Sequence, residues 1–461
     1  MKRTLDALAR DCGGILVGDP ELEIQGIATD SRRIEANTLF VAIRGPHFDG
    51  HDFVEEALAR GAAAVLVSSS VELSPTASWI RVPDTVRALG QIAHARRLRF
   101  TGPVIAITGS NGKTTTKEMC AAILAAAGVR VRRSPGNYNN EIGLPLSLLE
   151  LEDDDELIVV ELGMNHAGEI DGLARIAEPV VGTITQISPA HLGPLGSIEA
   201  IADAKGELFE RLRSDGIAVV NQDDARVSAQ AERFAGERIR FGSSASSDWR
   251  ALDVESESGY GRFRLVSPYG EADLKLAVPG RHMVQNALCA ATTASASGLL
   301  GERPLAAIRK GLENFAGIAG RLRVRPGGRG ITVIDDSYNA NPVSVEAALC
   351  TLREVASGGP AVAVLGDMLE LGDRARELHA GVGERVSQNA IQVLVAVGPL
   401  SRDTARAARE TGTAEVHEAE DAAGAAALLA PLLRGGETVL VKGSLAMQMK
   451  KVADSIAEGT D

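Results

Sequence analysis

The sequence has few aromatic residues, few cysteines and no long apolar run. Phe, Trp and Tyr make up 3% of its 461 residues, so Ala, Val, Leu and Ile must fill the cores. The cysteines Cys12, Cys120, Cys289 and Cys350 are widely separated and form no CxxC pair, which excludes a zinc knuckle and a secreted disulfide framework. No run approaches about 18 apolar residues and none follows the basic N-terminus, so we expect neither a transmembrane helix nor a signal peptide. These absences predict a cytoplasmic protein.

Positive charge is scarce relative to negative charge. The chain carries 48 Lys and Arg against 61 Asp and Glu, a formal net charge of −13. Such a protein has no general attraction for nucleic acid or an anionic membrane, although one pocket can still be basic and bind a small anion. Hydrophobic residues at 45% and charged residues at 24% are typical of a globular protein, which excludes disordered and collagen-like classes. The 49 glycines fit an α/β protein with tight turns between strands and helices.

Length and turn signals divide the chain into three parts. At about 150 residues for each domain, 461 residues predict about three domains. The turn TGP at 101–103 and the glycine-rich segment 317–330 are the predicted boundaries. We therefore expect an N-terminal domain over 1–100, a central domain over 101–318 and a C-terminal domain over 319–461.

Strand and helix patterns alternate along the chain, which predicts an α/β fold with mostly parallel sheets and right-handed crossovers. Short apolar runs predict strands, and apolar residues at helical spacing predict helices. The predicted strands lie at 38–43, 63–67, 104–108, 156–163, 181–188 and 216–224, and the predicted helices at 53–62, 85–100, 114–128 and 280–298. Alternating residues over 245–279 predict an antiparallel excursion, and the region after 330 has the alternation of a Rossmann-like domain.

The strongest local motif is TGSNGKTTT at 108–116, between a predicted strand and a predicted helix. Successive backbone N–H groups and a helix N-terminus form an anion cradle, in which Lys113 can reach the β- and γ-phosphates of ATP and Thr114 can bind Mg²⁺. The spacing differs from GxxxxGK[ST], because Ile107 stands where that pattern has its first glycine. The alternative is a glycine turn that caps a helix beside a solvated lysine. The predicted ATP-binding residues here are Gly109, Ser110, Asn111, Gly112, Lys113, Thr114 and Thr115.

This shortened loop resembles the ATP loop of the Mur ligases and of the related folylpolyglutamate synthetases. Further segments that resemble the family are GNYNNEIGLPLSLL (136–149), ELGMNHAGEI (161–170), AHLGPLGS (190–197), AKGELF (204–209), DDSYNANP (335–342) and LGDMLELG (365–372). Together they are most similar to the ligases that join D-alanyl-D-alanine to UDP-N-acetylmuramoyl-tripeptide in peptidoglycan synthesis. The resemblance implies a three-domain architecture, with a central P-loop ATPase domain and a C-terminal Rossmann-like domain. It also implies that ATP, with Mg²⁺, activates a peptide carboxylate as an acyl-phosphate, which an amine then attacks.

The resemblance further implies roles at the centre of catalysis. Lys113 contacts phosphate, Thr114 and Glu161 bind Mg²⁺, His191 is associated with a second Mg²⁺, and Lys205 is carbamylated. Carbamylation turns an ammonium group into an anionic oxygen ligand, which reverses the electrostatic role of the side chain. Without the family, Glu161 is a strand-end carboxylate, His191 a structural loop residue and Lys205 a solvated helix lysine.

Substrate contacts follow from the same resemblance. The UDP end of the substrate is expected on Ser31, Arg32, Arg44, Gly45, Asp49, Gly50 and His51, and its muramoyl-peptide part on Asn137, Asn139 and Asn140. ATP is further expected on Asn286, Arg321 and Asp336, and D-Ala-D-Ala beside Tyr338, Asn339 and Asn341. ATP would then lie between the central and C-terminal domains, whose closure would complete the site. Without the family, these are surface-loop, helix and linker residues.

The sequence departs from the family pattern at Gln186, Gly193, Met283 and Leu445. These departures weaken the assignment of individual contacts near His191 and near the C-terminus, and they leave the phosphate loop, Glu161 and Lys205 unaffected. Two alternatives stay open. One is a MurE-like or folylpolyglutamate synthase-like ligase, which the missing DNPR motif and the presence of GNYNNEIG disfavour; the other is a nucleotide-binding regulatory protein without ligase activity. The third residue of the tripeptide, meso-diaminopimelate or lysine, is also open. We expect a monomer that acts in cell-wall synthesis, and so in cell shape and division.

Overall fold

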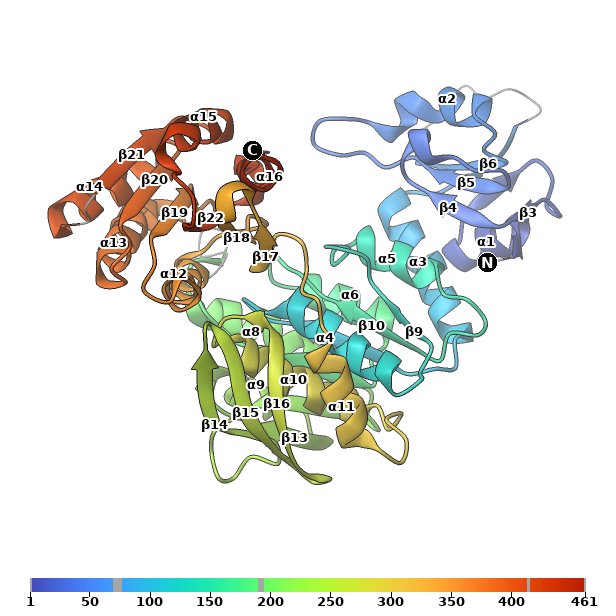
Figure 1. Cartoon of the computed structure of the whole chain (residues 1–461). Helices are drawn as coiled ribbons and strands as arrows, with labels where there is room; N and C mark the ends of the chain where they lie inside the picture. Colours follow the sequence, from blue (N-terminus) through green and yellow to red (C-terminus); the bar gives the residue numbers. More distant parts are fainter. Residues whose placement is uncertain (1, 69–76, 190–194, 413–414, 460–461) are drawn as a thin grey trace.

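The computed structural model describes residues 2–68, 77–189, 195–412 and 415–459. Figure 1 shows an N-terminal region in blue and a C-terminal region in red, which stand apart from each other on the same side of a central region. Each region is built around its own sheet, and the predicted α/β class is confirmed. None of the described helices has the length and apolar character needed to cross a membrane.

The N-terminal region holds a sheet of order β2-β7-β6-β5-β4, in which only β2 is antiparallel to its neighbour. The elements are β1 Arg3–Thr4, α1 Leu5–Cys12, β2 Ile15–Val17, β3 Glu23–Ile24, β4 Gly26–Ala28, η1 Ser31–Arg33, β5 Thr38–Val41, η2 Gly50–Phe53, α2 Val54–Ala59, β6 Ala64–Val67, β7 Ser78–Arg81 and α3 Thr85–Arg99. Both strands and both helices predicted here are confirmed. Asp84 starts α3, because its carboxylate accepts the N–H groups of Val86 and Arg87.

Helix α3 joins the N-terminal region to the central region. It packs against α1 on one side and against α5 and α6 on the other, within one continuous apolar core. The buried guanidinium of Arg97 donates to the carbonyls of Phe100, Ala177 and Glu178, which fixes the end of α3 to the end of α6. The predicted boundary after residue 100 follows α3 directly, and the division into domains at that residue stays a prediction.

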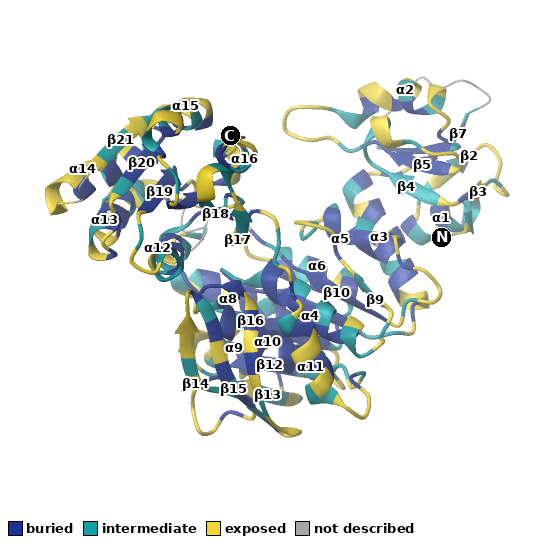
Figure 2. Cartoon of the chain, in the orientation of Figure 1, coloured by how far each residue is buried: buried dark blue, intermediate teal, exposed yellow. Residues whose placement is uncertain are grey.

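The central region contains a parallel sheet of order β13-β12-β11-β8-β10-β9, which Figure 2 shows as a buried layer among helices. Its elements are β8 Val104–Thr108, α4 Lys113–Ala126, β9 Val131–Arg133, α5 Gly143–Leu149, β10 Leu157–Glu161, α6 Glu169–Ala177, β11 Val181–Ile184, α8 Ile198–Glu210, β12 Ile217–Asn221, α9 Ala225–Ala231 and β13 Glu237–Phe241. Every residue of β8 and β10 is buried, as their unbroken apolar runs predict. The parallel pairing places Glu161, at the end of β10, beside Ile107, which precedes the phosphate loop.

The predicted antiparallel excursion is confirmed as the sheet β14-β15-β16. Its strands are β14 Arg250–Glu257, β15 Tyr260–Ser267 and β16 Gly270–Pro279, followed by the helices α10 Met283–Ala296 and α11 Pro304–Glu313. Both helices pack on α4. Helix α4 is therefore held between the central sheet and a second layer, which fixes the phosphate loop at its N-terminus.

The C-terminal region is built around a sheet of order β17-β18-β22-β19-β20-β21, antiparallel only at β17. Its elements are β17 Arg323–Pro326, η3 Gly328–Gly330, β18 Thr332–Asp336, α12 Pro342–Ala356, β19 Ala361–Gly366, η4 Gly372–Arg374, α13 Ala375–Gln388, β20 Val393–Val397, α14 Ser401–Thr411, β21 Glu415–Ala419, α15 Ala422–Leu432, β22 Thr438–Lys442, η5 Leu445–Met447 and α16 Lys450–Glu458. The predicted Rossmann-like alternation is confirmed. The sequence patterns gave no prediction for α14, β21 and α16; α14 buries only small residues such as Ala405 and Ala408, and β21 is half polar.

Helix α12 connects the C-terminal region to the central region at both of its ends. Near its C-terminus, Glu354 accepts a hydrogen bond from Ser256 at 2.7 Å. Val355 lies so close to Gly259 that a Cβ on that glycine would come within 2.6 Å of the valine side chain. The N-terminus of α12 carries Asn341, which reaches the phosphate loop.

Candidate active site

The phosphate loop turns between β8 and α4 on two glycines that have little room for a side chain. Gly109 and Gly112 have φ angles of +146° and +82°. A Cβ on Gly109 would lie 1.9 Å from the hydroxyl of Thr185, and a Cβ on Gly112 would lie 2.4 Å from the amide oxygen of Asn286. Asn286, predicted as an adenine contact, is therefore brought directly against the loop. The close approach of backbone to neighbouring groups is the geometry that a phosphate cradle needs.

The back of the loop is bound to the segment that follows β11. Ser110 and Ser188 exchange two hydrogen bonds of 2.9 Å, and Asn111 donates to the Ser188 hydroxyl at 3.0 Å. Thr185 donates to the carbonyl of Asn111 at 2.5 Å. Gln186 takes part through its carbonyl, which accepts the Ser110 N–H at 2.8 Å. The departure from the family pattern at Gln186 therefore leaves this hydrogen bond in place.

Lys113 and the end of β10 face each other across the loop. The Lys113 ammonium donates to the carbonyl of Gly109 at 2.8 Å, so the side chain folds back over the loop. Burial lowers the pKa of Lys113, and nearby Arg321 lowers it further, while Glu161 opposes the shift. Arg321, which comes from the C-terminal region, is thus brought to the same place as Lys113. Two cations beside a loop of N–H groups form a site for a polyanion.

Glu161 is held in one orientation by two partners. Its Oε2 accepts from the hydroxyl of Thr114 at 2.6 Å, and its Oε1 accepts from the amide of Asn139 at 2.8 Å. The residue is 2% exposed. A hydroxyl and a carboxylate are hard oxygen ligands of the kind that Mg²⁺ prefers, so the predicted pair Thr114 and Glu161 fits this cation. The described residues hold no cluster of three His, Cys, Asp or Glu, so further ligands to such a cation must come from phosphate, water or another residue type.

Lys205 lies on α8 and is 1% exposed, which rules out the solvated lysine that its motif alone would suggest. Burial lowers the pKa of its ammonium well below the usual range, the positive charge of Lys113 lowers it further, and Glu161 opposes the shift. The shift favours a neutral amine, the form in which an amine reacts with CO₂. The predicted neighbour His191 and the departure at Gly193 lie outside the described residues.

The C-terminal region places an aromatic ring, a cation and two amides at the loop. The Arg321 guanidinium lies 4.3 Å from the ring centroid of Tyr338. Burial raises the pKa of the Tyr338 hydroxyl, while Arg321 and a hydrogen bond with Asn137 lower it. Asn341 donates from its amide to Asn111 at 2.7 Å. These contacts bring the residues predicted for the dipeptide, ATP and the muramoyl peptide to one place.

Asp336 and Lys442 form a buried ion pair that the sequence did not indicate. The Lys442 ammonium donates to Asp336 at 2.6 Å and to the carbonyl of Asn339 at 2.8 Å. Burial raises the pKa of Asp336, and the charge of Lys442 opposes that rise. The positions of the two residues at the carboxyl ends of β18 and β22, which are adjacent parallel strands, are the signal that could have found the pair. The departures Met283 and Leu445 differ in exposure, at 4% and 58%.

In the N-terminal region, the predicted UDP segment forms a network around Asp49. The carboxylate accepts from Arg44 Nε at 2.7 Å, and the His51 ring contacts it at 2.6 Å. The backbone N–H of Ser68 donates to Nε2 of His51, so Nδ1 carries the ring proton and donates to Asp49. The N–H and side chain of His51, together with Arg44, hold the pKa of Asp49 well below its usual range.

The other residues predicted for the UDP end stand around this network. Ser31 begins η1, and the carboxylate of Asp30 caps it by accepting the N–H of Arg32. The Arg32 guanidinium pairs with Asp30 at 2.9 Å, and 79% of its side chain is exposed. Gly45 donates its N–H to the carbonyl of Phe48, and Gly50 lies where a Cβ would come within 2.5 Å of the Ile43 nitrogen.

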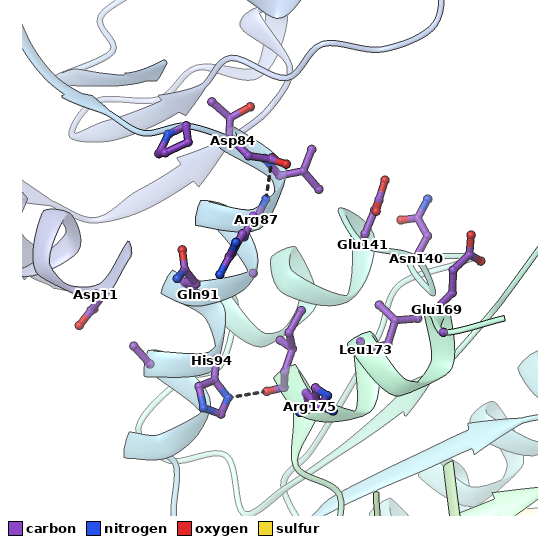
Figure 3. Close-up of a pocket in the computed structure, with 18 of the residues that line it drawn as sticks. Asp11, Asp84, Arg87, Gln91, His94, Asn140, Glu141, Glu169, Leu173 and Arg175 are labelled. Carbon is purple, nitrogen blue, oxygen red and sulfur yellow. Dashed lines mark hydrogen bonds between the residues drawn. The ribbon is translucent and has the colours of Figure 1, made fainter. Parts of the chain in front are cut away.

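A cleft of about 1230 Å³ lies between the N-terminal region and the central region. Arg87, Gln91 and His94 line it from α3, and Leu173 and Arg175 line it from α6 (Figure 3).

The lining of this cleft includes residues from two of the predicted binding segments. Arg44 belongs to the UDP segment, Asn140 belongs to the predicted peptide segment, and Gly163 lies two residues after Glu161. The cleft therefore contacts both segments, and Gly163 places one side of it just beyond the end of β10. Arg87 is a cleft cation that the sequence motifs missed.

Comparison with known proteins identifies the family and the fold. Family models match at residues 23–97 (Mur ligase family, catalytic domain), 107–294 (Mur ligase middle domain) and 320–445 (Mur ligase, glutamate ligase domain). The UDP-N-acetylmuramoyl-tripeptide--D-alanyl-D-alanine ligase of Escherichia coli is 36% identical over 99% of this chain and 98% of its own. A crystal structure of MurF from Acinetobacter baumannii is 34% identical, with a TM-score of 0.90 over 99% of each chain. MurF ligase from Thermotoga maritima, crystallised with ADP, is 28% identical, with a TM-score of 0.81 over 94% of this chain and 97% of that one.

Proposed function

The chain belongs to the Mur ligase family, and we propose that it joins D-alanyl-D-alanine to UDP-N-acetylmuramoyl-tripeptide while ATP is converted to ADP and phosphate. One arrangement carries the proposal. Glu161 lies between the phosphate loop, where Thr114 contacts it at 2.6 Å, and the large cleft, which Gly163 lines. A nucleotide on the loop and a long substrate in the cleft would therefore meet at the end of β10.

The reaction needs a phosphorylated carboxylate followed by attack of an amine. A carboxylate oxygen of the tripeptide attacks the γ-phosphorus of ATP, and the P–O bond to ADP breaks, which gives an acyl-phosphate. The amine of D-alanyl-D-alanine then attacks the acyl carbon; the new C–N bond forms, the C–O bond to phosphate breaks, and the nitrogen releases a proton. Catalysis of phosphoryl transfer depends mainly on position and on neutralisation of charge. Lys113, Arg321 and the backbone N–H groups at the N-terminus of α4 supply both at the phosphates.

Mg²⁺ is part of the proposal, with Thr114 and Glu161 as its protein ligands. When bound there, the cation would neutralise charge on the phosphate oxygens. The Asn139 amide keeps the carboxylate of Glu161 turned toward Thr114. His191, which follows the segment that braces the loop, is proposed to serve a second Mg²⁺.

Carbamylation of Lys205 is the second chemical feature that we propose. Its neutral amine would attack CO₂, a C–N bond would form, and one proton would leave, which converts a buried amine into an anionic oxygen donor. An isolated buried ammonium beside Lys113 would repel both that lysine and the cation expected at Glu161. A carbamate would remove this repulsion.

The three regions divide the substrates between them in this proposal. Residues 1–100 hold the UDP end, where Arg44 and Arg87 offer cations to the diphosphate. Residues 101–318 hold ATP and the tripeptide carboxylate, with Asn286 at the adenine. Residues 319–461 supply Asp336 for the ribose, and Tyr338, Asn339 and Asn341 for the dipeptide.

Phosphate release tests the function directly. Purified protein is given ATP, Mg²⁺ and UDP-N-acetylmuramoyl-tripeptide, in separate reactions with D-alanyl-D-alanine, a diamino acid, glutamate or no amine. Release that requires D-alanyl-D-alanine supports the proposal. Release with glutamate and a folate would instead identify a folylpolyglutamate synthase, and nucleotide binding without any release would identify a regulatory protein.

Two variations sharpen this test. Tripeptides that end in meso-diaminopimelate and in lysine are compared, which determines the third residue. The variant Glu161→Gln keeps the size of the side chain but removes its negative charge, so it should bind ATP without Mg²⁺ normally and release almost no phosphate. Unchanged release by Glu161→Gln would exclude the proposed site.

A further inference from the structure

Lys117 is a buried charged residue that the mechanism above does not use. It lies on α4, one helical turn after Lys113 and Thr114, and is 0% exposed. Lysine is almost never fully buried unless its ammonium is paired, so a specific reason for its position is required. Its side chain reaches the segment that follows β9.

The Lys117 ammonium binds that segment by its backbone. It donates to the carbonyl of Ser134 at 2.5 Å and to the carbonyl of Gly136 at 3.2 Å. Glu118 lies 3.2 Å from the same ammonium and also accepts from Arg133 at 2.6 Å. Lys117 and Glu118, two neighbouring residues of α4, therefore bind residues 133–136 to the helix that follows the phosphate loop.

The fastened segment leads directly to the amides that face the reaction site. Ser134 accepts the backbone N–H of Glu161 at 3.2 Å through its hydroxyl, and three residues after Gly136 comes Asn139. Asn139 accepts the N–H of Gly163 at 2.8 Å and donates to the Glu161 carboxylate at 2.8 Å. The next residue, Asn140, lines the cleft.

We propose that Lys117 is a positioning residue, which holds the segment 134–140 so that Asn139 and Asn140 meet the bound tripeptide. The inference rests on the proposed function for the identity of that substrate. A buried ammonium can satisfy two carbonyls at once, and an apolar residue of the same length would leave both without a donor. Lys117 would act through the segment that carries Asn139 and Asn140, whereas Lys113 lies one helical turn earlier and contacts the phosphate loop itself.

Binding measurements separate this role from a general structural one. Titration calorimetry gives the Kd for UDP-N-acetylmuramoyl-tripeptide and, without Mg²⁺ so that Glu161 does not contribute, the Kd for a non-hydrolysable ATP analogue. Lys117→Met should weaken tripeptide binding by about tenfold or more while the Kd for the analogue changes less than about twofold. Lys117→Gln keeps N–H donors and should fall between Lys117→Met and the wild type.

Met119→Ala is the matched control, because Met119 is also 0% exposed on α4 but lies in the apolar core. It should lower the melting temperature and leave both Kd values within about twofold of the wild type. Equal weakening of both ligands by Lys117→Met, or unchanged tripeptide binding, would overturn the inference. If Lys117→Met does not fold, Glu118→Gln decides: a rise in the tripeptide Kd alone supports the inference, and an unchanged Kd overturns it. D-Alanyl-D-alanine-dependent phosphate release by the wild type is measured separately, so failure of the function is distinguished from failure of this role.

Discussion

Replacing Asn341 with serine tests how much the amide contact between Asn341 and Asn111 contributes to holding the C-terminal region on the phosphate loop. Asn341 donates to Asn111 at 2.7 Å, across 230 residues of sequence. The same side chain caps α12, because its oxygen accepts the N–H of Ser344 at 2.9 Å. Serine is as good an N-cap as asparagine but is too short to carry an amide to Asn111. Asn341→Ser therefore removes the contact between regions and keeps the helix cap.

The structure gives the size of the expected effects. A neutral hydrogen bond contributes about 0.5–1.5 kcal/mol, so its loss should shift the balance between attached and detached regions by about 2- to 13-fold. Asn341→Ala also removes the cap and should cost about 1 kcal/mol more in the free energy of unfolding. Asn341→Ser should therefore weaken ATP binding with little change in melting temperature, and Asn341→Ala should change both.

A double-mutant cycle measures the contact itself. The cycle uses Asn111→Ala, Asn341→Ser and the double variant, with the Kd for an ATP analogue as the readout, because Asn111 alone also affects the loop. A coupling energy of about 0.5–1.5 kcal/mol is expected. A coupling energy near zero, or equal losses for Asn341→Ser and Asn341→Ala in both assays, would refute the reasoning.

Three further predictions follow from buried groups. Burial, aided by the charge of Lys442, lowers the pKa of His282 from 6.5 to about 4. As pH falls from 6.5 to 4, the histidine of the unfolded chain is therefore protonated before that of the folded chain, and the free energy of unfolding decreases by about 3 kcal/mol over that window. In thermal melts, His282→Gln should lose less stability in acid than the wild type, and an equal loss would contradict this. Asp336→Ala leaves the Lys442 ammonium without its carboxylate partner and should lower the free energy of unfolding in urea by about 3–5 kcal/mol. Adding Lys442→Met should restore much of that free energy. A double variant no more stable than Asp336→Ala would contradict the role of the ion pair. Lys205→Ala should nearly abolish phosphate release while near-UV circular dichroism stays native, and ¹³CO₂ should give a carbamate resonance in the wild type that this variant lacks; full activity or a retained resonance would remove the proposed role.

The parts of the site that the sequence could predict are those in which chemistry and local geometry share one segment. The phosphate loop follows a buried strand and opens a helix, so strand, glycines, Lys113 and Thr114 are fixed by adjacent residues. Glu161 could be placed as well, because parallel pairing of two apolar strands brings their carboxyl ends to one edge of the sheet. Family resemblance added the roles of these residues, and the structure shows that β10 pairs with β8, which brings Glu161 beside the loop.

The parts that the sequence missed depend on how separate regions pack. The pair Asp336 and Lys442 spans 106 residues, and no local spacing encodes it. The cleft between α3 and α6 lies where one apolar core joins the N-terminal and central regions. Amphipathic patterns in the sequence do not specify which helices pack together, so they could not predict this cleft. The sequence did not indicate Lys117 for a different reason. In the sequence it looks like an ordinary helix lysine, and its complete burial in the structure is what points to a specific role.

In the proposed function, helix α12 would make the binding of the nucleotide and the binding of the dipeptide interdependent. Its C-terminal end is fixed to β14 through Glu354 and Ser256, and its N-terminal end touches the phosphate loop through Asn341. The residues proposed for the dipeptide, Tyr338 and Asn339, immediately precede that end. A dipeptide that favours the attached position of α12 would also favour the loop geometry that binds ATP, and would strengthen ATP binding by some factor. Thermodynamic linkage then requires ATP to strengthen dipeptide binding by the same factor. Because both effects pass through the contact between Asn341 and Asn111, Asn341→Ser should reduce the two factors equally.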